Sequence, residues 1–307
     1  MNTFHLKTIP LLFLLIPISI FSQDYVDILK VGYGTTFNST FEDSPHSTDV
    51  NNFEIGLTYP VVLNEKNALI TGADFNLTSL QLAPVSEYTN LYSTTFKIGL
   101  SSTFNEKWSG TFVLLPKIAS DYHSISSDDF YFGGFASLKY KKNKHLTYRF
   151  GFYSSSEAFG VFATPIFGVY YKSSNQRLVI DASLPITANI NYNLGAATIG
   201  FDYLGIGRSY LIHQENTLPV YVEQSPLEFS SYFQLNTFNK NVLVRAKLGY
   251  TTNEHEVYAE NDKLDFRLSA FSFGNDRRQL NSSLNGSLFI KFEAIYRFHI
   301  KKKESNN

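Results

Sequence analysis

The chain has 307 residues, with 26 basic and 27 acidic side chains, a formal net charge of −1 and no cysteine. The balanced charge gives no indication of a nucleic-acid partner, and the lack of cysteine excludes disulfides, thiolate catalysis and a lipidated N-terminal cysteine. Twenty tyrosines and 28 phenylalanines against one tryptophan favour a strand-rich protein, either a membrane β-barrel with aromatic girdles or a soluble β-sandwich.

The N-terminal segment has the pattern of a secretory signal. A weakly basic start precedes an apolar core at residues 9–21, which contains Pro10 and Pro17. Such a core is short for a helix that spans a membrane, so cleavage is the better interpretation. We therefore expect residues 1–23 to be a cleaved signal peptide and residues 24–307 to form a single domain.

The rest of the chain reads as strands, separated by tight polar turns and longer polar loops. Six tight turns are rich in turn-forming residues, and they lie at 64–67, 105–107, 141–144, 173–176, 193–195 and 239–241. Six turns on one side imply fourteen strands when both termini lie on that side. The expected strands are 25–37, 51–63, 68–80, 91–103, 108–119, 130–140, 145–154, 161–172, 177–184, 186–192, 196–209, 226–238, 242–251 and 286–300.

The last strand has the clearest pattern. From residue 288 to 300, apolar side chains fill one face, while Lys291, Glu293 and Arg297 lie on the other. A run of this length suits a strand that crosses a bilayer at a tilt, with lipid outside and water within. Together with the signal, it predicts a protein of the outer membrane of a Gram-negative bacterium.

These patterns predict an all-β fold, a transmembrane antiparallel up-and-down β-barrel of about fourteen strands. Twelve strands is the main competing number. The weakest part of the count is the long loop at 252–285, because residues 263–273 within it also alternate. That segment is either a hairpin arm above the membrane or a further spanning strand.

The middle of the chain resembles a known family. The segments that carry the resemblance are 132–154 (FGGFASLKYKKNKHLTYRFGFYS), 165–171 (PIFGVYY), 178–192 (LVIDASLPITANINY) and 201–210 (FDYLGIGRSY). They are similar to the domain of unknown function 6268, a family of exported proteins of Gram-negative bacteria regarded as outer-membrane barrels. The resemblance implies location and architecture, and it supplies no catalytic residues. Pro165 and Pro185 match its pattern, and we expect them at strand ends.

Twelve charged side chains fall on the expected inner faces of the strands. They are Lys30, Glu54, Asp74, Lys97, Arg149, Asp181, Asp202, Arg245, Lys247, Lys291, Glu293 and Arg297. Charge is costly in a membrane unless it faces water or a partner. The mixed signs fit either a hydrated pore with weak ion preference or a cross-strand ion-pair network that closes the interior.

Two outer loops carry clusters of titratable side chains. The first contains Asp121, His123, Ser124, Asp128 and Asp129. A histidine between carboxylates is a candidate base for a hydrolase, but a solvated loop contains such residues without a role, and a triad depends on geometry. The second contains Glu254, His255, Glu256, Glu260 and Asp262. This set is a candidate site for a divalent ion, although a solvated loop is the stronger interpretation.

We expect a barrel that is not an enzyme, needs no cofactor or metal, contacts outer-membrane lipid and, if it transports, passes small solutes passively. The first alternative is a structural or surface-binding barrel with a closed lumen, which acts through its outer loops and notably through 252–285. A less favoured alternative is a barrel lipid hydrolase that uses His123. The sequence identifies no protein partner.

Overall fold

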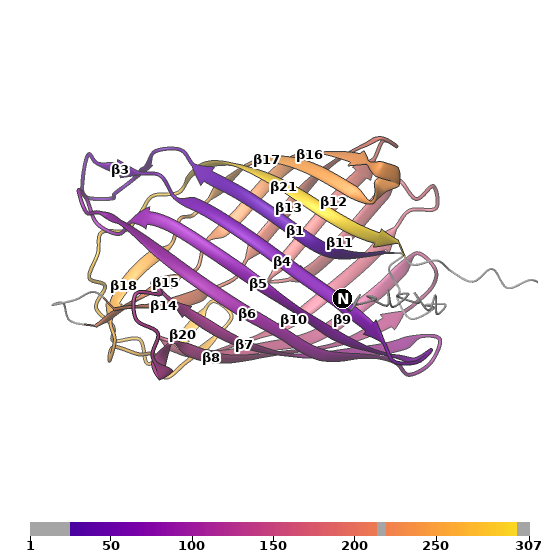
Figure 1. Ribbon diagram of the computed structural model, residues 1–307, viewed down its shortest axis with the longest axis horizontal. Coiled ribbons are helices and arrows are strands. Elements are labelled where there is room, and N and C mark those ends of the chain that lie inside the picture. The colour runs from indigo at the N-terminus through magenta and orange to yellow at the C-terminus, as the bar shows by residue number, and fades with distance from the viewer. Residues whose placement is uncertain (1–24, 214–218, 300–307) are drawn as a thin grey trace, which may run out of the picture.

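A computed structural model describes residues 25–213 and 219–299. Fourteen long strands form a closed antiparallel barrel (Figure 1). In chain order they are β1 (Tyr25–Thr36), β4 (Asn51–Val62), β5 (Asn67–Gln81), β6 (Tyr88–Thr103), β7 (Trp108–Ser120), β8 (Phe130–Lys141), β9 (Leu146–Glu157), β10 (Gly160–Lys172), β11 (Leu178–Leu184), β12 (Thr187–Asn193), β13 (Ala197–Gly205), β16 (Leu227–Thr237), β17 (Val242–Thr251) and β21 (Ser287–His299).

Strand pairing closes the barrel. Each long strand pairs with the long strands that precede and follow it in the chain, and β1 pairs with both β4 and β21. The prediction of an antiparallel barrel of fourteen strands is confirmed, and twelve strands is excluded. The predicted signal peptide at 1–23 lies outside the described residues.

The two ends of the barrel differ. Strand β1 begins and β21 ends at the same end, on the right in Figure 1, and we call this the terminal end. Its six connections lie at the predicted tight turns. The opposite end, which we call the loop end, carries the long connections 37–50, 206–226 and 252–286. The first of these contains a small separate hairpin of β2 (Ser39–Thr40) and β3 (Ser47–Thr48).

Alternation along the strands separates an apolar outside from a polar inside. On β21, the side chains of Leu288, Phe292 and Tyr296 are exposed, whereas Lys291 and Glu293 between them are buried. The period of two residues places these two sets on opposite faces. Exposed large apolar side chains recur in the same way on most of the wall strands.

The described residues include no helix with the length and hydropathy of a membrane span. Their helical structure is limited to two short 3-10 turns, η1 (Ser127–Asp129) and η2 (Phe238–Lys240).

Part of the loop end crosses the lumen. The connection from β13 to β16 forms the hairpin β14 (Arg208–Ile212) and β15 (Val220–Gln224), and β15 pairs with β18 (His255–Ala259) of the last loop. Strand β14 also pairs in parallel with β7, the fifth strand of the barrel, although it follows the eleventh strand, β13. The hairpin therefore reaches from one wall to nearly the opposite one. We call β14, β15 and β18 the plug.

An apolar core fills the space around the plug. Tyr210, Tyr221 and Val222 of the plug are completely buried, and they belong to one cluster with Leu80 and Leu91 at the ends of wall strands. Burial of each such side chain contributes on the order of 1.5–3 kcal/mol. The loop end of the lumen is consequently filled by an apolar core.

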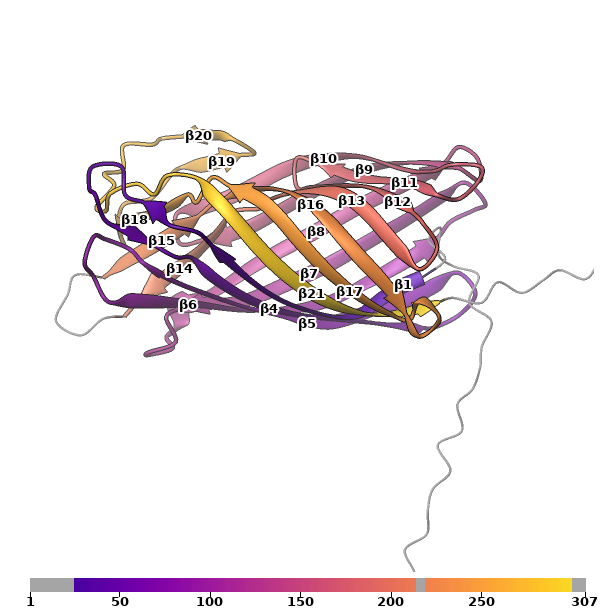
Figure 2. The ribbon, with the colours of Figure 1, turned by 90° about the horizontal axis from the view of Figure 1, so that it is seen from above.

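The barrel wall is lower at β11 and β12, which have seven residues each, whereas β10 has thirteen. Beyond them, β10 pairs in parallel with β19 (Phe266–Leu268), which forms a hairpin with β20 (Phe271–Phe273) (Figure 2). The alternating segment 263–273 is thus a hairpin at the loop end and not a spanning strand.

Two strand boundaries differ from the sequence prediction. The predicted strand 196–209 ends at Gly205, because Arg208 already begins the plug. Pro165 was expected at a strand end but lies inside β10, opposite Phe152 of β9. On its other side, the pairing of β10 with β11 begins only at Phe167. A missing N–H is tolerated where a strand lacks a second neighbour. Pro185 lies in the turn between β11 and β12, as expected.

Candidate functional site in the lumen

The structure places all twelve charged residues predicted for the lumen in ion pairs. Seven of them form one connected network across β13, β17, β21, β1 and β4. Its nitrogen–oxygen distances are 3.0 Å for Lys291–Glu54, 2.9 Å for Lys30–Glu54, 2.9 Å for Lys30–Glu293, 3.1 Å for Arg245–Glu293, 3.1 Å for Lys247–Glu293 and 2.6 Å for Lys247–Asp202. The network lies on one side of the inner wall. It resembles the second of the two interpretations of these charges, in which cross-strand pairs close the interior.

Strand register builds this network. Glu293 of β21 lies opposite Gly32 of β1 and opposite Arg245 of β17. A Cβ atom at Gly32 would lie 2.9 Å from the Glu54 side chain, so glycine leaves the room that this carboxylate uses to reach Lys30. The Glu293 carboxylate is completely shielded from solvent, and it stays charged inside the barrel because three cations surround it.

The remaining predicted lumen residues form separate pairs. These are Lys97–Asp74 at 2.7 Å, Arg149–Asp181, and Arg297 with Asp27 at 2.5 Å. Arg149–Asp181 bridges β9 and β11 across β10, so its partners lie on strands that do not pair directly.

One further pair attaches the plug to the wall. Lys117 of β7 and Glu157 of β9 lie 2.6 Å apart, and both side chains are buried. The second oxygen of Glu157 accepts hydrogen bonds from the backbone N–H of Ser209 (3.0 Å) and from its hydroxyl (2.7 Å). Sequence reasoning missed this pair, because Glu157 lies three residues beyond the expected end of its strand.

A second buried cluster holds the plug to the last loop. The Glu223 carboxylate accepts from Arg267 and, at 2.8 Å, from Arg277. The guanidinium of Arg267 lies 4.7 Å from the centre of the Phe159 ring, and that of Arg277 lies 4.0 Å from the centre of the Tyr258 ring. No alternation marks Glu223 in the sequence, since the plug strand is buried on both faces.

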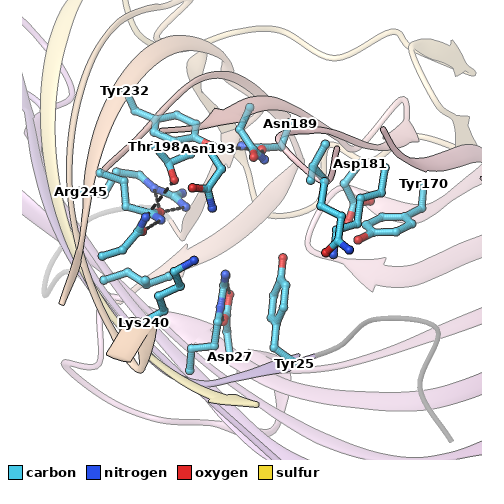
Figure 3. A pocket seen from close by; sticks show the side chains of 18 of the residues that line it. Tyr25, Asp27, Tyr170, Asp181, Asn189, Asn193, Thr198, Tyr232, Lys240 and Arg245 are labelled. Atoms are coloured by element: carbon cyan, nitrogen blue, oxygen red, sulfur yellow. Dashed lines mark hydrogen bonds and ion pairs between the residues drawn. The ribbon is translucent and has the colours of Figure 1, made fainter. Parts of the chain in front are cut away.

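A polar cavity of about 530 Å³ opens at the terminal end, and we call it the vestibule (Figure 3). Three arginines there each lie over a tyrosine ring. The distances from Cζ to the ring centre are 3.5 Å for Arg297 and Tyr25, 6.0 Å for Arg149 and Tyr170, and 4.3 Å for Arg245 and Tyr232. Each guanidinium also has a carboxylate partner, so its orientation is fixed before any ligand arrives.

Carboxamides cover much of the remaining vestibule wall, and several are joined in two hydrogen-bonded groups. Tyr232 donates its hydroxyl to Asn189 (3.1 Å), and the amide of Asn191 donates to the same oxygen (2.7 Å). Gln234 accepts from Arg245 (2.7 Å) and donates to Asn236 (2.7 Å). The vestibule therefore presents oriented donors and acceptors together with fixed positive charge.

The cluster around His123 does not assemble as a catalytic triad among the described residues. Asp121 accepts from the backbone N–H of His123 (3.1 Å), and Asp129 lies 2.8 Å from Nε2 of His213. Asp129 also closes a capping box with Ser126 at η1. His213, which the sequence did not single out, follows the plug strand β14, so these contacts join the loop 121–129 to the plug.

The acidic segment 254–262 is partly built into the plug. His255 is buried, its Nδ1 lies 3.1 Å from the Asn253 carbonyl oxygen, and burial lowers the pKa of its imidazole to about 4. Glu256 accepts a hydrogen bond from the Tyr258 hydroxyl (2.7 Å). Within residues 25–213 and 219–299, no group of three histidines or carboxylates has an arrangement that would hold a metal ion.

Comparisons with known proteins give one family. The sequence model of the family described as "Domain of unknown function (DUF6268)" matches residues 70–292. No curated protein matches the chain.

Several solved barrels are similar in structure. A bacterial polysaccharide outer membrane secretin has 9% identity and a TM-score of 0.35, with 88% of this chain and 98% of that chain covered. The NanC porin has 8% identity and a TM-score of 0.35, with 87% and 98% covered. The CymD monoaromatic hydrocarbon channel has 12% identity and a TM-score of 0.36, with 89% of each chain covered. Similarity at this level carries no inference about a substrate.

Proposed function

The chain belongs to the family described as "Domain of unknown function (DUF6268)", and from that premise we propose that it is an outer-membrane pore for small polar solutes, closed at the loop end by its plug. The observation that carries the proposal is the vestibule, a polar cavity inside a barrel whose outer surface is apolar. A lumen lined in this way is what a pore requires, since passage depends on wall polarity and width rather than on a catalytic group.

The outer surface supports a membrane location. Exposed side chains such as Leu57, Leu248 and Phe292 would be costly in water as a continuous belt, but they suit contact with lipid tails. The test is heat modifiability of the mature chain after refolding in detergent. A change of gel mobility on boiling would support a closed, detergent-resistant barrel, whereas solubility without detergent and an unchanged mobility would contradict the membrane location.

The lumen also supports passage of polar solutes beyond the vestibule. A second cavity of about 300 Å³ lies farther in, lined by Lys30, Glu54 and Arg208. Arg208 is the first residue of the plug strand β14, so this cavity ends at the plug itself. Polar cavities therefore lie both at the terminal end of the lumen and next to the plug, and the apolar core lies beyond them.

Conductance of single barrels in a planar bilayer tests the pore. Gly205 and Leu227 pair directly across β13 and β16, so a short Gly/Ser turn can join these strands in place of residues 206–226. We expect the wild type to conduct weakly and the shortened variant to conduct strongly and steadily. The matched control shortens the exposed tip 42–47 of another loop at the same end, and its conductance should equal that of the wild type.

A second candidate is a closed barrel that acts through its outer loops. The tight packing of the plug and the buried Glu223 cluster favour it. If removal of residues 206–226 leaves a folded barrel that still does not conduct, the pore is wrong and this second candidate replaces it.

A further inference from the structure

Positive charge is concentrated in the vestibule. Five cationic and two acidic side chains line it, an excess of three positive charges in a chain whose formal net charge is −1. The cations are Arg149, Lys172, Lys240, Arg245 and Arg297, and the acids are Asp27 and Asp181. Arg245 also pairs with Glu293 of the network in the middle of the lumen. If Arg245 is left out of the count for that reason, the vestibule still has four cations and two carboxylates.

The middle of the lumen has a different charge balance. Its connected network joins four cations to three carboxylates, so nearly every charge there is compensated by a neighbour. A wall lined by one excess sign, with low-dielectric surroundings, concentrates ligands of the opposite sign. The vestibule is therefore the part of the lumen best suited to an anion.

The uncharged part of the vestibule favours a ligand with many hydroxyl groups. Six carboxamides and three tyrosines line the cavity, and they are Gln176, Asn189, Asn191, Asn193, Gln234, Asn236, Tyr25, Tyr170 and Tyr232. A carboxamide offers both donors and acceptors, which is what a sugar hydroxyl needs on each side. Tyrosine adds an apolar ring and a polar tip.

We infer that the vestibule is a binding site for a small anionic sugar, whose carboxylate or phosphate group is held by the cations and whose hydroxyls are held by the carboxamides. A cavity of about 530 Å³ lies within the usual range for pockets that enclose a small ligand. The three arginines are already fixed by their tyrosines and carboxylates, so little side-chain order is lost on binding. The inference rests on the proposed function only in that solutes must reach the lumen.

Calorimetric titration of the refolded mature barrel tests the site. The ligands are D-glucuronate, a hexose phosphate and D-glucose, which shares the hydroxyl pattern without the charge. We expect at least one of the two anions to bind about tenfold more tightly than glucose, the equivalent of one charge-assisted hydrogen bond. Preference for glucuronate alone identifies a carboxylate ligand, and preference for the hexose phosphate alone identifies a phosphate ligand.

A pair of double variants separates the site from general electrostatics. Lys172→Gln with Lys240→Gln removes two vestibule cations, and it should weaken anion binding about tenfold while leaving glucose unchanged. Lys66→Gln with Lys107→Gln removes two exposed charges from tight turns at the same end, and it should change neither affinity. Both proteins are first checked for heat modifiability.

Three results would overturn the inference: equal affinity for glucose and both anions, no measurable binding of any of them, or equal loss of anion binding in the two double variants. Conductance measurements distinguish this failure from that of the pore. Anion binding without conductance contradicts the pore and leaves the site standing, whereas conductance without anion preference contradicts the site and leaves the pore standing.

Discussion

The plug and the vestibule contain the same group of side chains in different surroundings. At the plug, Arg277 of the last loop lies over Tyr258 and binds Glu223, and the two charged side chains are each 1% exposed. In the vestibule, Arg297 lies over Tyr25 and binds Asp27, and these charged side chains are 16% and 38% exposed. When one partner is lost, the remaining charge is left without solvent only at the plug, because the vestibule pair is open to water. Access of water therefore decides how much each cluster contributes to the stability of the folded protein.

The largest effect should come from Glu223→Ala. It leaves Arg267 and Arg277 buried without their carboxylate, which we expect to destabilise the loop end by about 3–5 kcal/mol. Limited proteolysis of the loop end measures this as faster cleavage. Glu254→Ala removes an exposed carboxylate of the same region and should leave the rate unchanged. Equal rates in the two variants would contradict the role of burial.

A pH dependence should follow from His255. Its folded pKa of about 4 lies below the ordinary value of 6.5, so protonation is easier after the plug opens. Stability of the plug is then complete above about pH 6.5 and falls by up to about 3 kcal/mol as the pH approaches 4. Lys291 and Glu228 are the charged side chains that line the same small cavity as His255.

Proteolysis rates between pH 7 and pH 4 measure this dependence, and His255→Gln should reduce it because glutamine stays neutral. A slope that is the same in the variant would assign the effect to the carboxylates of the region instead.

Glu293→Ala should have an intermediate effect. Lys30, Arg245 and Lys247 lose a shared carboxylate, but Lys30 keeps contact with water, since its side chain is 40% exposed. We expect a loss of about 1.5–3 kcal/mol in the free energy of unfolding in urea. Glu65→Ala in an exposed turn is the control. A loss as small as that of the control would mean that water replaces the carboxylate fully.

The smallest effect should come from Arg297→Gln. Its partner Asp27 is 38% exposed, so the expected loss is at most about 1 kcal/mol and should shrink further at high salt. The same urea titration at two salt concentrations measures it. A loss comparable to that of Glu223→Ala would contradict the claim that exposure to water makes the vestibule pair contribute less to stability than the plug pair.

Local chemistry was sufficient to predict the wall of the barrel. The tight turns at 64–67 and 239–241 contain residues that favour turns whatever surrounds them, and the alternation on β21 follows from a backbone period of two. The position of charges such as Glu54 and Lys291 on the inner face followed from the same period. Their exact partners did not, because Lys30, Glu54 and Glu293 come from three strands whose register is set by pairing across the sheet.

The sequence by itself determined the architecture of this protein and the inner face of each strand, because these depend on neighbours along the chain, and it favoured fourteen strands while leaving twelve open. Only the tertiary structure decided that β14 and β15 cross the lumen, that Glu223 meets Arg267 and Arg277, and that a charged vestibule remains open at the other end. The plug strands are buried on both faces and pair with distant segments. Their sequences therefore show no alternation from which their position in the lumen could be predicted.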